Sequence, residues 1–150
     1  MKKIFTAICI FALIFSMATP VFADEHQTVI LVQEIDLDDG VTATSKIMEL
    51  SNLWATDKTY AHTMTLKREG VVIGEVTIMA TFRYNGTTVS VVTKSVTQTD
   101  TYNGWNYKQN SFTSSNGTVT LDAKLTKLLI YNVPFTMSIV CDKDGNITLS

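Results

Sequence analysis

Apolar and polar side chains alternate with a period of two along several stretches of the chain. Segments 76–84, 119–125 and 135–141 each place apolar residues at every second position and mainly polar residues between them. Such alternation is typical of antiparallel strands that bury one face and expose the other. The pattern therefore predicts an all-β protein.

Turn residues divide these segments at short intervals. Six of the seven glycines follow Asp, Glu or Asn, at Gly40, Gly70, Gly86, Gly104, Gly117 and Gly145. Asn-Gly and Asp-Gly accept the positive φ that tight hairpins need. The two long intervals predict hidden turns in Ser51–Lys58 and around Asn132–Pro134. We expect eight or nine strands in one antiparallel β-sandwich with an immunoglobulin-like fold.

Two segments leave the type of element open. Ser45–Trp54 fits a strand or a short helix with Ile47, Leu50 and Trp54 on one side. Thr126–Tyr131 is equally ambiguous.

The N-terminal residues have the pattern of an export signal. Lys2 and Lys3 precede an apolar run, and small residues occupy the −3 and −1 positions of a cleavage site after Ala23. The alternative is an uncleaved membrane anchor, but the run is shorter than the roughly 20 residues that span a bilayer. We expect a signal peptide over 1–23 and one secreted, extracellular domain over 24–150.

Removal of this segment changes the charge of the 150-residue chain. The remainder keeps all 14 acidic residues and 10 of the 12 basic ones, so its formal net charge is −4. An acidic chain without a basic cluster argues against nucleic acid and against anionic membrane surfaces as partners. We therefore expect no membrane contact after cleavage. Cys141 is then the only cysteine, which excludes an internal disulfide.

Candidates for catalysis are few. Cys141 and His62 both lie at apolar positions of alternating segments, where packing explains them. No nucleophile or phosphate-loop motif occurs. The remaining enzymatic alternative is a carboxylate-based hydrolase. Its carboxylates would come from Glu34, Asp36, Asp38, Glu75 and Asp122. We expect no enzyme and no cofactor.

Two acidic segments, 34–40 and 142–146, resemble calcium loops in composition only. Neither has glycine at the sixth position of an EF-hand ladder, and the second is better explained as a hairpin turn.

Cleavage after Ala23 would create one metal site. The new terminus, Asp24-Glu25-His26, offers an amine, two backbone amides and an imidazole. Four nitrogen ligands in a plane suit Cu(II) or Ni(II). The alternative is a frayed terminus with an incidental histidine.

Aromatic and amide residues gather in 100–112. Tyr102, Trp105 and Tyr107 lie among asparagine and glutamine there, as a sugar-binding surface requires. In the alternative interpretation, Trp105 and Tyr107 point inward and anchor the core. Trp54 has the same two interpretations.

The order of several segments resembles a known group of proteins. These are FRYNG at 82–86, NGWNY at 103–107 and SIVCDKDGNITL at 138–149. The chain resembles small secreted β-domain proteins of Gram-positive bacteria (Firmicutes), a group without an assigned activity. The resemblance implies a secreted β-domain and no functional residues.

These features favour a non-catalytic extracellular binding or surface-associated module with a glycan or protein ligand. The alternative is a small secreted antagonist or toxin-like protein that acts on competitors or membranes. An exposed apolar or basic patch would favour this alternative.

Overall fold

The computed structural model describes residues 26–37, 40–51 and 57–149, and this part of the chain is all β. Its strands are β1 (His26–Asp36), β2 (Val41–Ser51), β3 (Lys58–Arg68), β4 (Val71–Tyr84), β5 (Val89–Thr101), β6 (Asn106–Ser115), β7 (Thr118–Lys127), β8 (Tyr131–Cys141) and β9 (Ile147–Thr148). Among these residues no helix is long and apolar enough to cross a membrane. The predicted signal peptide lies outside the described residues.

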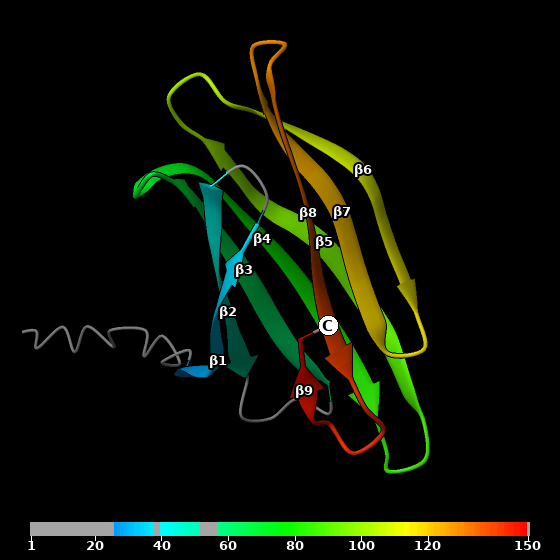
Figure 1. Cartoon of the computed structure of the whole chain (residues 1–150). Helices are drawn as coiled ribbons and strands as arrows, with labels where there is room; N and C mark the ends of the chain where they lie inside the picture. Colours follow the sequence, from blue (N-terminus) through cyan, green and yellow to red (C-terminus); the bar gives the residue numbers. More distant parts are fainter. Residues whose placement is uncertain (1–25, 38–39, 52–56, 150) are drawn as a thin grey trace, which may run out of the picture.

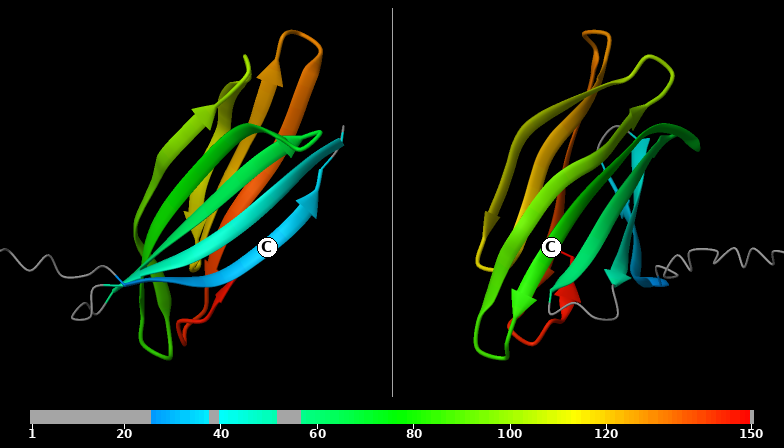
Figure 2. Two further views of the ribbon diagram at one scale, coloured as in Figure 1. Left: turned by 90° about the vertical axis from the view of Figure 1, so that its left-hand side faces the viewer. Right: turned by 180° about the vertical axis from the view of Figure 1, so that it is seen from behind.

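The strands form two antiparallel sheets that face each other (Figures 1 and 2). The first sheet has the order β1-β2-β3-β4-β5 and the second β6-β7-β8-β9. Within each sheet, every strand thus pairs with its neighbours in sequence, as in a meander. An immunoglobulin domain has Greek-key connections instead. The predicted antiparallel, sandwich-like all-β fold is confirmed, whereas the immunoglobulin-like topology is not.

The core lies between the sheets and follows the predicted alternation. Val76, Ile78, Ala80 and Phe82 of β4 are buried, and so are the alternate apolar residues of β7 and β8. Large side chains such as Tyr60 on β3 complete the same cluster. Burial of apolar side chains is the main favourable contribution to the stability of such a sandwich.

Both ambiguous segments are settled by the structure. Residues 45–51 belong to β2, which pairs along its length with β1 and β3, so the helical alternative is wrong there. Residues 52–56, with Trp54, lie outside the described residues. Segment 126–131 is the end of β7, a turn and the start of β8.

The turn predicted around Asn132–Pro134 is also wrong, because these residues lie inside β8. Proline cannot donate to a ladder and is tolerated at sheet edges. Pro134 pairs with Lys124 of β7, and β9 reaches β8 only at Val140 and Cys141. Pro134 therefore lies where β8 has a neighbour on one side only.

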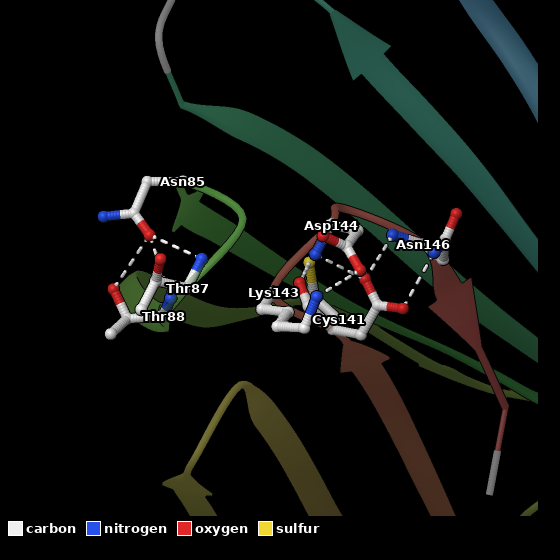
Figure 3. Close-up of polar contacts among 8 residues, drawn as sticks. Asn85, Thr87, Thr88, Cys141, Lys143, Asp144 and Asn146 are labelled. Atoms are coloured by element: carbon white, nitrogen blue, oxygen red, sulfur yellow. Dashed lines mark hydrogen bonds and ion pairs between the residues drawn. The ribbon is translucent and has the colours of Figure 1, made fainter.

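Two polar turns meet at one end of the sandwich (Figure 3). The carboxamide oxygen of Asn85 accepts backbone hydrogen bonds from the residues that follow it. The carboxylate of Asp142 accepts bonds from the backbone amides of Asp144 and Asn146, at 2.8 and 2.9 Å. The Gly86 amide donates to the Lys143 carbonyl, which joins the two turns. The second acidic segment is thus a hairpin turn, as predicted, and its first carboxylate is engaged by its own backbone.

Candidate functional site

The predicted aromatic residues do not form one exposed surface. Tyr102 is 45% exposed, Trp105 is only 5% exposed and Tyr107 is partly buried against the core. The turn between them is closed by a hydrogen bond of 3.1 Å from the Trp105 amide to the Tyr102 carbonyl. Asn103 and Gly104 take the positive φ values of this turn. It directs Trp105 inward, as in the alternative interpretation of this segment.

Trp105 fixes the packing around this turn. Its ring lies 5.9 Å from the ring of Tyr131, measured between centroids. The guanidinium carbon of Arg68, on β3 of the first sheet, lies 4.1 Å from the centre of the Tyr131 ring, on β8 of the second sheet. This stack joins the two sheets through aromatic and cation–π contacts. With most of its ring covered, Trp105 offers little surface for stacking on a sugar.

Three chain connections meet at this end of the sandwich, which we call the loop end. They are the β3–β4 turn at Glu69–Gly70, the β5–β6 turn at Tyr102–Trp105 and the β7–β8 turn at Leu128–Ile130 (Figure 1). A cavity of about 340 Å³ opens between them. Its lining residues are Arg68, Glu69, Val71, Ile73, Asn103, Trp105, Lys127 and Tyr131.

The β7–β8 turn carries three consecutive exposed apolar residues, which we call the apolar tip. Leu128, Leu129 and Ile130 have exposed fractions of 74%, 107% and 76%. Val71 and Tyr102, also at the loop end, are exposed as well. Contiguous apolar surface of this kind is a mark of an interaction site.

The tip also carries backbone strain. Leu128 has a φ of +53°, in the left-handed region that side chains other than Gly, Asn and Asp disfavour. A turn at this place would ordinarily use a polar residue or glycine. Non-glycine residues in such conformations concentrate at functional sites.

Two basic residues line the cavity beside the apolar tip. Lys127 precedes it in sequence and lines the cavity together with Arg68. The Nη1 atom of Arg68 is buried and has no hydrogen-bond partner among the described residues. A guanidinium donor without a partner is suited to a phosphate or carboxylate oxygen. The exposed carboxylate of Glu69 lies at the rim of the same cavity.

The other predicted residues lie elsewhere. Of the proposed copper site, Asp24 and Glu25 are outside the described residues, and His26 begins β1, opposite Ser51. Within the described ranges no group of three or more His, Cys, Asp or Glu is placed to hold a metal ion.

Two of the candidate carboxylates of a hydrolase, Glu34 and Asp36, lie two positions apart on β1, whereas Glu75 and Asp122 are not brought together. Glu75 of β4 interacts with Thr65 on the outer face of the first sheet. Asp122 of β7 interacts with Ser111 and Thr136 on the outer face of the second. The core lies between these two faces, so this pair cannot act on one bond. Asp38 lies outside the described residues.

Cys141 is buried at the end of β8, where burial raises the pKa of its thiol to about 11. The thiol is therefore protonated at neutral pH, which suits the packing role predicted for it.

Comparisons with known proteins give no indication of the function. No family model matches the chain, and no curated protein or solved structure does.

Two of the residues predicted from the sequence, Tyr102 and Trp105, lie at the loop end. The apolar tip and the position of Arg68 were not predicted. The signal for the apolar tip is present, because Leu128–Ile130 is an apolar run with no turn residue in it. This signal is ambiguous, because the same apolar run also fits a strand or a helix.

Proposed function

We propose that this protein is a non-catalytic extracellular module that attaches to a phospholipid surface through its loop end. The observation that carries the proposal is the apolar tip, Leu128–Ile130, which is almost fully exposed. The expectation of no membrane contact rested on the acidic net charge and the lack of a basic cluster in the sequence, and both bear on anionic surfaces rather than on insertion of apolar side chains.

The geometry of the tip favours lipid over a protein partner. Consecutive side chains in a tight turn point in different directions, so one flat or grooved protein surface covers them poorly. Hydrocarbon surrounds such a tip from all sides. Interfacial segments bury apolar side chains about 5–10 Å deep, at the boundary of headgroups and acyl chains.

The residues behind the tip fit the headgroup layer. Lys127 and Tyr131 flank the tip on either side, and basic and aromatic side chains favour the membrane–water interface. Arg68 lies over Tyr131 and lines the cavity, and its buried Nη1 atom has no hydrogen-bond partner among the described residues. A guanidinium group beside the inserted tip is suited to a lipid phosphate.

Sedimentation with vesicles of phosphatidylcholine and phosphatidylglycerol tests the proposal. We expect the protein lacking residues 1–23 to bind them saturably. Serine at positions 128, 129 and 130 together should weaken binding about 1,000-fold or more, because each buried Leu or Ile side chain contributes about 1.5–3 kcal/mol. Val32→Ser, which changes an equally apolar exposed residue on β1, should leave binding unchanged.

Several outcomes of this experiment would overturn the proposal. Vesicle binding that is absent in the unaltered protein, or equal in the triple variant, excludes attachment through the tip. Self-association that is lost in the triple variant would show that the tip contacts a second copy instead.

The toxin-like alternative is a second candidate, because the exposed apolar patch that favours it is present. Dye release from the same vesicles separates the two functions. An attachment module binds without releasing dye, whereas a membrane-damaging antagonist releases dye in proportion to the protein bound.

The strained residue of the tip gives a further prediction. Leu128→Asn should stabilise the fold by about 1 kcal/mol, because asparagine accepts the left-handed conformation more readily than leucine. The same variant should bind vesicles less tightly. Urea unfolding and vesicle sedimentation measure the two effects, and a loss of stability would contradict the assignment of strain to Leu128.

A further inference from the structure

A second cavity lies between the two sheets and shares no residue with the loop end. Its volume is about 290 Å³, and β1, β2, β3 and β8 contribute to its walls. Leu149, which follows β9, also lines it. The proposed lipid attachment does not use this cavity.

His62 of β3 lines the cavity with a hydrogen-bond acceptor. Its side chain is 1% exposed, and its Nδ1 atom lies 3.0 Å from the carbonyl oxygen of Ser138. Because a carbonyl only accepts, Nδ1 carries the proton. Burial lowers the pKa of His62 to about 4, so the imidazole is neutral at pH 7. Its Nε2 atom is then an acceptor, and it has no partner among the described residues.

Ser45 of β2 lines the cavity beside His62. Ser45 pairs with Met64, and Ile47 pairs with His62, so the serine and the histidine are diagonal neighbours on the inner face. Ser45 is 1% exposed, and its Oγ atom also lacks a partner within the described part of the chain. A buried polar atom without a partner costs about 1–3 kcal/mol. Two such atoms in one cavity indicate a place made for a ligand rather than for packing.

The other lining residues restrict the charge and polarity of a ligand that fits the cavity. Ile35, Met64 and Leu149 give it an apolar side, and no lining residue in the described part of the chain carries a charged side chain. A carboxylate would lack a cation and would meet the lone pair of Nε2. A hydroxyl group fits both atoms, because it donates to Nε2 and accepts from the Ser45 hydroxyl.

We propose that the inter-sheet cavity is a binding site for a small neutral alcohol or phenol, with Ser45 and His62 holding its hydroxyl group. A protein cavity of about 150 Å³ accepts benzene, so the volume here accommodates a substituted ring or a short aliphatic chain.

Calorimetric titration with p-cresol and with toluene tests this proposal. The two probes share their apolar part and differ in the hydroxyl group. The unaltered protein should bind p-cresol at least tenfold more tightly than toluene. Ser45→Ala should weaken p-cresol binding about tenfold and leave toluene binding unchanged, because one hydrogen bond to the ligand is lost. Ser95→Ala, on the exposed outer face of β5, is the matched control.

Two further measurements locate the ligand. The ¹⁵N resonance of His62 Nε2 should move on addition of p-cresol and stay in place with toluene. Leu149→Trp should block the cavity and abolish binding of both probes while the thermal midpoint stays near that of the unaltered protein.

The proposal is overturned if neither probe binds, which would mean that water alone occupies the cavity. It is also overturned if p-cresol and toluene bind equally, or if Leu149→Trp leaves p-cresol binding unchanged. None of these outcomes bears on vesicle binding, which depends on the apolar tip.

Discussion

Acidification from pH 6.5 to pH 4 should destabilise the folded protein by about 3 kcal/mol through His62 alone. In the unfolded chain this imidazole titrates near its ordinary pKa of 6.5, whereas burial lowers the pKa to about 4 in the fold. Between these values the unfolded state binds a proton and the folded state does not. Each unit of difference corresponds to 1.36 kcal/mol.

The sign of the effect follows from the direction of the shift. The contribution of His62 to stability is complete above pH 6.5, declines as the pH falls and levels off below about 4. Among the described residues that line the cavity, none has a carboxylate to stabilise an imidazolium. Asp57 and Asp142 have lowered pKa values, so their contributions are lost only at still lower pH.

Urea unfolding at a series of pH values measures this decline. His62→Gln is the matched variant, because its amide can donate to the Ser138 carbonyl without titrating. The decline between pH 6.5 and 4.5 should be much smaller in this variant. An equal decline in both proteins would exclude His62 as its source.

Gly117→Ala should destabilise the protein by about 3 kcal/mol. Gly117 lies in the β6–β7 turn with a φ of +76°. A Cβ atom there would lie 2.4 Å from the Cys141 carbonyl oxygen and 2.6 Å from a methyl carbon of Val89. The left-handed backbone contributes about 1–2 kcal/mol of this cost, and the displacement of packed neighbours contributes about 1–3 kcal/mol.

Gly70→Ala is the control that separates the two contributions. Gly70 has nearly the same φ, +79°, but no heavy atom lies within 4 Å of the added Cβ. It should cost only about 1–2 kcal/mol, the backbone contribution. Urea unfolding of both variants gives the comparison. Equal losses would show that the neighbours of Gly117 accommodate the added Cβ atom without a measurable cost.

The sequence predicts local features of this fold well because alternation and turn chemistry are local properties. Residues 78–82 alternate between buried and half-buried positions as expected, although Thr77 is buried as well, and Asn-Gly and Asp-Gly pairs close hairpins. It fails where tertiary pairing overrides a local pattern. Segment 45–51 has a helical periodicity, but β1 and β3 pair with it on both sides.

The candidate sites depend on information that one sequence does not contain. The alternation of Tyr60, His62 and Met64 shows that His62 points inward, but only the register of β2 and β3 places Ser45 beside it. Arg68 reaches Tyr131 because the two sheets face each other, and 63 positions separate these residues in the chain. The apolar tip could not be predicted, because apolar residues typical of strands occupy a turn there.

The consecutive order of strands has a consequence for how the protein folds. Within each sheet every strand pairs with the next one in the chain, so each hairpin closes a short loop. Chains dominated by such local pairings fold faster than Greek-key sandwiches, whose partners are distant in sequence. Because the core lies between the two sheets, neither meander buries its apolar face alone, and we expect their docking across the β5–β6 connection to be the last step.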